Sequence, residues 1–388
     1  MNLKNTIEKI VMASTELNIT KMKRHILTDK YFKLLIISLC TLLQLQFVSA
    51  QRVFEKCGTP SSAYDKLTDI RPENFRILAG TRVIKMHVVI YANDDGSSQA
   101  ISEEELKTEI LFANSIYNQG EICFALVGVE VRNNTFFNSA IFGFTNFSGQ
   151  TVSGAFTVFI VNTINEGIFG WAPSTPATYM ITKKSGFGTR RTFIHEMGHA
   201  FGLEHTFKGT ARDADNPGCD ELVNGTNGTT CGDFVTDTPA DPYTRCGTNS
   251  LSGCTFPYTA PGCVDANSSS YSPQMNNMMS YWANYECDRI VFSSGQYSRM
   301  RSFIDNTASL SVFLATDNLV LSNATISSGF VRQGAKLSIT AGNAGSGNYT
   351  LSGTVQATYS ANTVTATPGF TATPSGTGVV RILASSCY

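Results

Sequence analysis

The sequence is poor in charge and in histidine. Only 15% of the 388 residues are charged, the formal net charge is −1, and there is no block of basic residues. A chain without a basic patch is not expected to bind nucleic acid. Because the chain has only 5 histidines, a cluster of them in one short segment is informative about metal binding.

Long hydrophobic runs are also missing. The apolar run at residues 34–43 is too short for a membrane span. Basic residues precede it, at Lys21, Lys23, Arg24, Lys30 and Lys33. The small residues Val48-Ser49-Ala50 follow it, which is the order of parts in a signal peptide. We therefore expect residues 1–50 to be a signal peptide, with Met22 as the true start, and the mature protein to be secreted or at the cell surface, without a membrane span.

Three of the histidines lie in one segment, His195-Glu196-Met197-Gly198-His199-Ala200-Phe201-Gly202-Leu203-Glu204-His205. On a helix, His195 and His199 project from one face and supply two corners of a tetrahedral zinc site. Gly202 permits a positive φ, so the chain can turn and bring His205 back as a third ligand. The fourth position stays open for water, as in a catalytic zinc site, and Glu196 is placed to take a proton from that water.

This pattern is similar to the long zinc signature of the metzincin metalloproteases, which also carry a methionine-bearing turn downstream. The segment Asn277-Met278-Met279-Ser280-Tyr281-Trp282 fits that turn. Further matching segments are His205-Thr206-Phe207, Gly232-Asp233-Phe234-Val235-Thr236-Asp237-Thr238-Pro239, Cys287, Phe292-Ser293-Ser294-Gly295-Gln296 and Arg299-Met300. On these motifs, residues 82–314 resemble the pappalysin (cytophagalysin) family of secreted bacterial metalloproteases.

The resemblance implies roles for two residues of the turn. In the family, the methionine two residues before the tyrosine forms a hydrophobic floor under the zinc; Met279 matches it, with Met278 as its adjacent alternative. The family tyrosine matches Tyr281, whose phenol can donate a hydrogen bond to a developing oxyanion. A core aromatic with a satisfied hydroxyl is the other interpretation of Tyr281.

A structural calcium ion is the second cofactor that we expect. Acidic residues gather between the zinc helix and the methionine turn, at Asp213, Asp215, Asp220, Glu221, Asp233, Asp237 and Asp241. Carboxylate oxygens on loops suit calcium, and the family binds it near this region. Asp233, Asp237 and Thr238 are the ligands that we expect. A solvated acidic loop is the alternative.

The cysteines indicate an oxidising compartment. Of the 10 cysteines, removal of Cys40 with the signal peptide leaves an odd number. Six follow the zinc helix, at Cys219, Cys231, Cys246, Cys254, Cys263 and Cys287. The resemblance implies the pairs Cys231–Cys254 and Cys246–Cys287, which leaves Cys219 for Cys263. A second zinc site is the alternative use of these cysteines, which an extracellular location disfavours.

Residues 51–82 are predicted to form a pro-segment. Lys56-Cys57-Gly58-Thr59-Pro60 resembles the latency peptide of matrix metalloproteases, in which a cysteine thiolate occupies the fourth zinc position. Cys57 is therefore the expected latency residue; a disulfide between Cys57 and Cys123 is the alternative. Release of the segment requires cleavage near Arg71, Arg76 or Arg82.

The predicted fold is an α/β (α+β) metzincin catalytic domain over residues 83–316, with a mixed twisted sheet, a zinc helix and a methionine turn. Alternating and β-branched patterns predict strands at residues 83–91, 122–131 and 156–161. Helices are predicted for three segments: residues 103–118 after a capping box of Ser102 and Glu105, residues 189–203, and residues 295–305. His87, on the first strand, is expected to be a core or surface residue and not a ligand.

Two further segments complete the domain picture. Ile168-Phe169-Gly170-Trp171-Ala172-Pro173 is similar to the family's edge strand, so we expect Gly170, Trp171 and Ala172 to bind an extended peptide by β-augmentation. An ordinary strand and turn is the alternative. Residues 317–388 are rich in Ser, Thr and Gly with short alternating apolar runs, which predicts a small all-β module similar to those that follow secreted bacterial enzymes.

The sequence therefore predicts a secreted zinc metalloendopeptidase, made as a latent zymogen, that acts on protein or peptide substrates; it does not indicate an oligomeric state. Two other classes compete with this prediction. One is a zinc-bearing adhesin without activity, against which Glu196 and Tyr281 count. The other is a hydrolase of a non-peptide substrate, which the edge strand and the latency peptide disfavour.

Overall fold

The computed structural model describes residues 56–57, 80–187, 191–209, 219–242, 256, 263–282, 289–343, 347–383 and 387. The chain divides into two compact units, Met1–Val53 and Phe54–Tyr388, and all described residues belong to the second. The expected signal peptide, Arg71 and Arg76 lie outside the described residues. Within the ranges described, no helix is long and apolar enough to cross a membrane.

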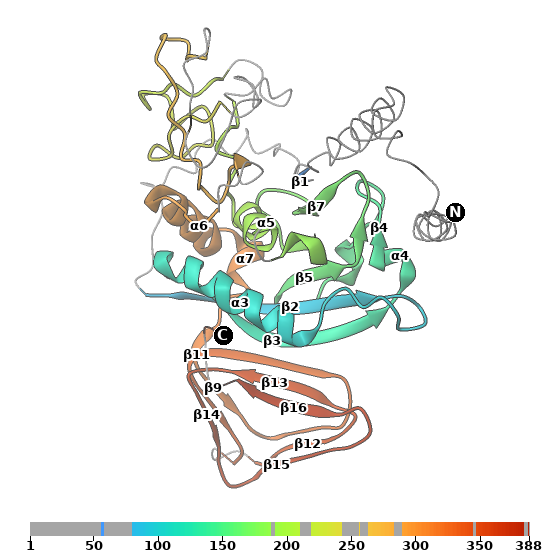
Figure 1. The fold of residues 1–388 in the computed structure, drawn as a ribbon. Coiled ribbons are helices and arrows are strands. Elements are labelled where there is room, and N and C mark those ends of the chain that lie inside the picture. Colours follow the sequence, from blue (N-terminus) through green and yellow to red (C-terminus); the bar gives the residue numbers. More distant parts are fainter. Residues whose placement is uncertain are drawn as a thin grey trace, which may run out of the picture. The chain divides into compact units, whose positions relative to one another are not determined.

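A six-stranded mixed sheet organises the first part of this unit (Figure 1). Its order is β1 (Lys56–Cys57), β7 (Ile168–Trp171), β8 (Tyr179–Lys183), β5 (Phe156–Val161), β2 (Arg82–Ala92) and β3 (Ile122–Asn133). Neighbouring strands are parallel except for β7 and β8, which are antiparallel. All residues of β5 and most of β2 are buried, as expected for strands covered on both faces. The three predicted strands are present, with β2 and β3 slightly longer than predicted.

Arg82 is the first residue of β2 and belongs to the folded domain. Its side chain is 3% exposed, and its Nη2 atom lies 2.8 Å from Asp305 Oδ2. Its backbone N–H donates to the Glu121 carbonyl oxygen at 2.7 Å. The strand β2 therefore begins one residue before the predicted strand, and Arg82 is buried in it, so cleavage after Arg82 is disfavoured.

One predicted helix begins at the expected residue and another begins one residue earlier. The helix α3 (Glu103–Tyr117) starts with a capping box, in which Ser102 accepts from the Glu105 N–H and Glu105 accepts from Ser102. The helix α6 (Ser294–Asn306) starts with a second capping box. Short elements complete this part: η5 (Asn118–Gly120), α4 (Thr135–Asn138), β4 (Ser139–Ala140), η6 (Ser148–Gln150), β6 (Thr163–Ile164), η7 (Lys184–Gly186) and α7 (Ala308–Ser311).

The helix that carries two of the histidines, α5 (Thr192–Ala200), is shorter than the predicted 189–203. Arg191 precedes it with φ +57°, and Gly202 follows it with φ +96°. A Cβ on Gly202 would stand 2.1 Å from the Phe303 ring, so both the turn and the close approach of α6 require glycine. Residues 188–190 lie outside the described part.

Aromatic packing fixes α5 against the sheet. The Tyr117 hydroxyl donates to the Ile194 carbonyl oxygen at 2.8 Å, which joins α3 to α5. Phe201 stacks on Phe124 of β3 at a centroid distance of 5.8 Å. These rings belong to one buried cluster between the sheet and α3, α5 and α6. The helix is therefore a rigid base for the side chains that it carries.

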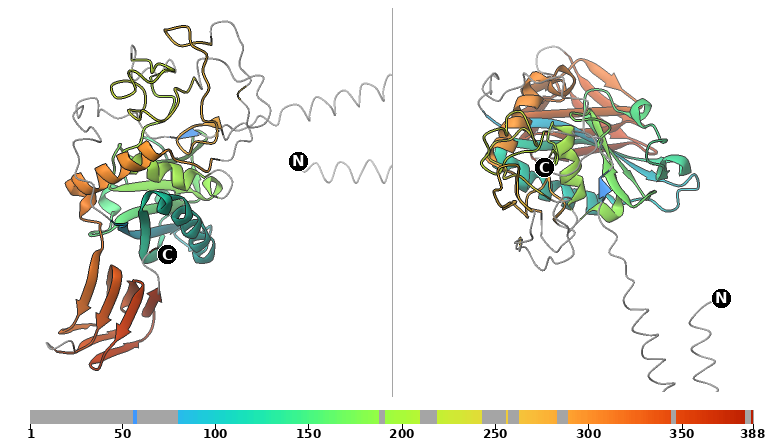
Figure 2. Two further views of the ribbon diagram at one scale, coloured as in Figure 1. Left: turned by 90° about the vertical axis from the view of Figure 1, so that its left-hand side faces the viewer. Right: turned by 90° about the horizontal axis from the view of Figure 1, so that it is seen from above.

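The described part of residues 316–383 contains strands and no helix. Every pair of these strands is parallel. The strands are β9 (Thr316–Leu321), β10 (Ala324–Ile326), β11 (Phe330–Ala341), β12 (Tyr349–Gly353), β13 (Gln356–Ser360), β14 (Thr363–Ala366), β15 (Phe370–Pro374) and β16 (Val379–Leu383). Strand β10 pairs with β12 and β12 with β15; β11 pairs with β13 and β13 with β16. This repeated return to the same neighbours is a parallel β-solenoid, whose strands run side by side in Figure 2.

The solenoid is fastened to β3. Cys123 of β3 forms a disulfide with Cys387, so the predicted alternative, Cys57–Cys123, is wrong. A Cβ on Gly334 of β11 would stand 2.9 Å from Val127 Cγ1 of β3, which shows how closely the two strands pack. His87 is fully buried beneath this contact, and its Nδ1 accepts from Arg332 Nε at 2.8 Å. His87 is thus a core residue and belongs to no metal-ligand group in the described residues.

The second disulfide corrects the predicted pairing in the acidic loops. Cys219 is bonded to Cys231, with 5.1 Å between their Cα atoms, so the predicted pairs Cys231–Cys254 and Cys219–Cys263 are wrong. The physical reason is a tight turn, in which the Cys231 N–H donates to the Asn227 carbonyl oxygen at 2.9 Å and folds the chain back toward Cys219. The predicted Cys246–Cys287 pair lies outside the described residues.

Candidate active site

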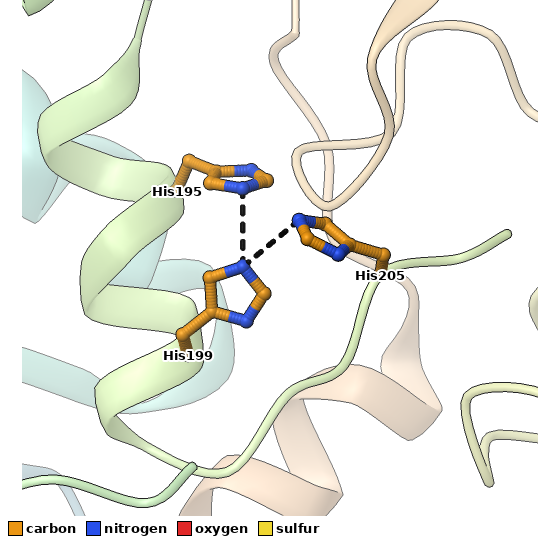
Figure 3. Close-up of side chains that lie close together, drawn as sticks. All are labelled: His195, His199 and His205. Carbon is orange, nitrogen blue, oxygen red and sulfur yellow. Dashed lines mark hydrogen bonds between the residues drawn. The ribbon is translucent and has the colours of Figure 1, made fainter. Parts of the chain in front are cut away.

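Three histidines converge at the end of α5 (Figure 3). His199 Nε2 lies 3.1 Å from His195 Nε2 and 3.1 Å from His205 Nε2. His195 and His199 project from one face of the helix, and the turn at Gly202 returns His205 to them, as predicted. Within the described residues, these three form the only group of three or more His, Cys, Asp or Glu side chains that could hold a metal ion.

Backbone carbonyls orient two of the imidazoles. His195 Nδ1 lies 2.7 Å from the Met278 carbonyl oxygen, and His199 Nδ1 lies 2.7 Å from the Leu203 carbonyl oxygen. A carbonyl oxygen only accepts hydrogen bonds, so the Nδ1 atom of His199 carries the proton. The Nε2 lone pair of His199 therefore points into the cluster, which is the tautomer that binds a metal. The Nδ1 atom of His195 lies near both this kind of acceptor and the Arg289 guanidinium, which only donates, so the carbonyl oxygen orients the ring without fixing its tautomer.

The environment keeps the histidines neutral. Burial holds the pKa of His195 well below its ordinary 6.5, and the Arg289 guanidinium lowers it further. Burial also lowers the pKa of His199 to about 4 and holds that of His205 well below its ordinary value. Three neutral imidazoles with converging lone pairs repel one another unless a cation lies between them. Zinc at about 2.0–2.1 Å from each nitrogen separates the nitrogens by roughly 3.3 Å, so this donor set fits zinc.

Glu196 lies between the histidines and β7. Its side chain is fully buried. A Cβ placed on Gly170 would stand 2.9 Å from Glu196 Cγ and 2.8 Å from the Ile181 carbonyl oxygen. The strand β7 therefore passes so close to Glu196 that only glycine fits at position 170.

The side chains of two predicted substrate-binding residues, Trp171 and Ala172, are buried in the protein. Trp171 is 7% exposed and packs against Phe142 and Phe147 at ring distances of 5.5 and 5.9 Å. Ala172 is fully buried. One edge of β7 pairs with β8, and the other pairs with β1, where Cys57 is opposite Gly170.

Tyr281 lies beside the histidines, as predicted. Its ring centroid is 4.9 Å from that of His205 and 5.8 Å from that of His195. Phe207 completes the cluster, because its ring stacks on His205 at 4.6 Å and lies 4.9 Å from Tyr281. Tyr281 is half-buried in this cluster of rings.

The two methionines of the turn have different contacts. A Cβ on Gly198 would stand 2.6 Å from Met279 Sδ, so the Met279 side chain packs against α5 between the two helical histidines. Met278 instead supplies the carbonyl oxygen that orients His195. Both side chains are fully buried. Of the two, Met279 is the one whose side chain contacts the histidine-bearing helix at Gly198.

The three predicted calcium ligands are not equivalent. Asp233 is buried and accepts from the Thr238 hydroxyl at 2.9 Å. Asp237 instead binds the start of α6, where its carboxylate accepts from the Ser293 hydroxyl at 2.6 Å and from the Gly295 N–H at 2.8 Å. The structure therefore gives Asp237 a helix-capping role that the sequence did not predict.

Glu221 is a stronger candidate than Asp237. Its side chain is 1% exposed, and neither carboxylate oxygen has a hydrogen-bond partner among the residues that the structure describes. A Cβ on Gly232 would stand 2.3 Å from Glu221 Oε2, so the glycine leaves room for the carboxylate. Burial raises the pKa of Glu221, and the charges of Asp233 and Asp241 raise it further. Burial raises the pKa of Asp233 as well.

Two buried residues near the histidines have no counterpart in the prediction. Arg289 places Nη1 3.0 Å from His195 Nδ1 and donates to the Ser280 carbonyl oxygen at 3.3 Å. Asp241 accepts hydrogen bonds from residues that adjoin His205 and Tyr281. The only sequence signal for Asp241 was its membership of the acidic cluster, and Arg289 had none.

No protein-family model matches the chain, and no curated protein does. Among solved structures, the chain is similar to the crystal structure of metalloproteinase-II from Bacteroides fragilis, with 13% identity and a TM-score of 0.24. The aligned part covers 38% of this chain and 52% of that one, so the chain spans about half of the length of that structure. A TM-score this low establishes no shared fold.

Proposed function

We propose that the protein is a secreted zinc-dependent endopeptidase of the metzincin type, similar to the pappalysins, that cleaves extended protein substrates. The observation that carries the proposal is the convergence of three neutral imidazoles beside Glu196 and the edge of β7. A structural zinc site would have a fourth protein ligand, and the described residues offer none.

His195, His199 and His205 would hold the zinc ion, which supplies a Lewis acid and lowers the pKa of a bound water to about 7. Glu196 takes a proton from the attacking water and delivers it to the leaving amine. The Tyr281 phenol donates a hydrogen bond to the oxyanion that develops on the scissile carbonyl. The backbone of β7 at Gly170 pairs with the substrate and sets its direction across the site.

The proposal includes latency. The strand β1 pairs with the same edge of β7 that an extended substrate would need, so the pro-segment and the substrate compete for it. The register sets Cys57 opposite Gly170, and Gly170 lies against Glu196. A thiolate from this position would displace the water, so we propose that the pro-segment must be removed before the enzyme acts.

The proposal also includes a structural calcium ion at Glu221 and Asp233. Two buried carboxylates, one of them without hydrogen-bond partners, are costly unless a cation compensates them. Oxygen ligands on loops suit calcium, and the Thr238 hydroxyl lies beside Asp233. The ion would join the Cys219–Cys231 loop to the segment that leads toward Asp241.

Hydrolysis assays test the proposed activity. Mature protein, with zinc and calcium, is incubated with a quenched casein and with a small arginine-containing peptide. We expect cleavage of both, abolished by a chelator and lowered at least 100-fold by Glu196→Ala, since proton transfer contributes about 10²–10⁴-fold. Stoichiometric zinc binding without any cleavage, after confirmed removal of the pro-segment, would contradict the proposal and favour the adhesin interpretation.

A further inference from the structure

Asp241 is a buried carboxylate at the centre of a three-donor network. It is 2% exposed. Its Oδ2 atom accepts from the Thr206 hydroxyl at 2.7 Å and from the Ser280 hydroxyl at 2.8 Å, and its Oδ1 atom accepts from the Trp282 indole N–H at 3.0 Å. One side chain therefore joins two segments that are far apart in the sequence.

The three donors flank the residues of the candidate site. Thr206 directly follows His205, and Ser280 and Trp282 stand on either side of Tyr281. The backbone reinforces the connection, because the Thr206 N–H donates to the Met279 carbonyl oxygen at 3.2 Å. With Ser280 and Trp282 both bound to Asp241, the backbone of Tyr281 is held on its two sides.

The side chains between these donors pack on one another. The ring of Tyr281 lies 4.9 Å from His205 and 4.9 Å from Phe207. A displacement of either segment would change the distance between the Tyr281 phenol and His205. Because Asp241 binds both segments, it fixes that distance.

We infer that Asp241 is a positioning residue, which sets the place of the Tyr281 phenol relative to His205 and thereby its hydrogen bond to the oxyanion. The inference rests on the proposed function, since that hydrogen bond belongs to peptide hydrolysis. The hydrogen bonds of Asp241 reach Thr206, Ser280 and Trp282, which adjoin His205 and Tyr281, so it would act through these neighbours. A carboxylate suits the role because it accepts all three hydrogen bonds at once, whereas no other side chain of its size offers acceptors only.

A double-mutant cycle tests the inference. The variants are Asp241→Ala, Tyr281→Phe and the double variant, each as mature zinc-loaded protein, with kcat and KM measured on the quenched peptide. We expect Tyr281→Phe to lower kcat about 100-fold, as loss of an oxyanion donor does, and Asp241→Ala to lower kcat at least tenfold with little change in KM. The double variant should be within about twofold of Tyr281→Phe, because Asp241 acts through Tyr281. Multiplicative effects would overturn the inference.

Two further variants separate positioning from stability. Ser280→Ala removes one donor and leaves the carboxylate in place, so it serves if Asp241→Ala does not fold; we expect a smaller fall in kcat that also vanishes in the Tyr281→Phe background. Asp305→Ala is the matched control, because Asp305 is a carboxylate 3% exposed that accepts from Arg82, between α6 and β2. It should lower the melting temperature and leave kcat unchanged. An equal fall of kcat in Asp305→Ala would overturn the inference.

A readout without activity distinguishes this inference from the proposed function. Fluorotyrosine at position 281 gives one ¹⁹F resonance in the zinc-loaded protein. We expect Asp241→Ala or Ser280→Ala to shift or broaden it and Asp305→Ala to leave it unchanged. If no peptide is cleaved but the resonance moves, the proposed function fails and the positioning role stands. An unchanged resonance in both variants overturns the positioning role, whatever the activity.

Discussion

At the scale of the residue, the site depends on which groups are neutral and which are charged. The histidines are neutral because burial lowers their pKa values, and the Leu203 carbonyl oxygen fixes the tautomer of His199. Glu221 and Asp233 are in the opposite situation. Burial raises their pKa values, so the folded chain resists the ionised forms that a calcium ion requires. Calcium binding should therefore release protons from these carboxyl groups, so that the effect of calcium on stability depends on pH.

The sign of this linkage gives a prediction. The folded pKa of Glu221 is above its ordinary 4.5, so the folded state binds more protons than the unfolded state above about pH 4.5. Without calcium, the free energy of unfolding should therefore fall as the pH rises from about 5 to 8. Calcium, which binds the ionised carboxylates, should raise the melting temperature more at pH 8 than at pH 5. Calorimetry with zinc present throughout measures both effects.

Glu221→Gln is the variant for this prediction. It removes the charge from the buried position, so the calcium-free protein should lose much of its pH dependence and the calcium response should disappear. Calcium at 100 times its Kd stabilises a protein by about 2.7 kcal/mol. An undiminished calcium response in Glu221→Gln would show that the ion binds elsewhere or only to the surface.

At this scale, the sequence predicted those site residues that lie within one short segment of the chain. His195, His199 and Glu196 share one helix, and His205 follows a single turn, so a linear pattern contains them. Asp241 and Arg289 could not be predicted in their roles, because their partners come from distant segments. Glu221 differs from the other acidic residues only in its burial, which a sequence does not display.

At the scale of the element, the close approach of α5 and β7 matters most. The sequence predicted β7 as an edge strand, but β7 pairs with β8 on one side and with β1 on the other, so β1 lies at this edge of the sheet. It did not predict that Trp171 and Ala172 would be buried, because a short apolar run does not reveal which face is covered. The ends of α5 were misplaced for a similar reason, since the left-handed Arg191 has no sequence signature.

Gly170→Ala tests this approach. The new methyl group would stand 2.8 Å from the Ile181 carbonyl oxygen, 2.9 Å from Glu196 Cγ and 3.1 Å from Thr192 Cγ2. Overpacking of this kind costs about 1–3 kcal/mol, and displacement of Glu196 should lower kcat/KM at least tenfold. Gly149→Ala is the control, because no atom lies within 4 Å of its Cβ and its φ is not positive. Equal kcat/KM in both variants would show that a methyl group at position 170 fits between β7 and Glu196 without displacing Glu196.

At the scale of the whole molecule, the features that could not be predicted are contacts between segments far apart in the sequence. The strand-rich composition after residue 316 predicted β structure, but the stacking of β10 on β12 and β15 becomes visible only in the pairing. The Cys123–Cys387 disulfide spans 264 residues, and no local pattern specifies it. The Cys219–Cys231 disulfide was not predicted, because the expected pairs rested on a resemblance and not on the fold of this loop.

The pairing of β1 with β7 leads to a prediction about the whole precursor. Cys57→Ala should make the uncleaved precursor hydrolyse the quenched peptide, because a thiolate no longer replaces the water. Lys56→Ala, on the same strand, should stay latent. The precursor must remain intact during the assay, which gel electrophoresis verifies. A Cys57→Ala precursor as inactive as the unchanged precursor would show that the β1–β7 pairing alone, or nothing in this segment, blocks the site.

The central claim is that His195, His199 and His205 hold one zinc ion, and metal analysis of the purified protein tests it most directly. We expect one zinc per chain in the unchanged protein and in Glu196→Ala, since Glu196 is not a ligand. His199→Ala should contain none, because two imidazoles do not complete the site. Zinc retained in His199→Ala, or an unchanged protein that takes up no zinc after reconstitution, would contradict the account.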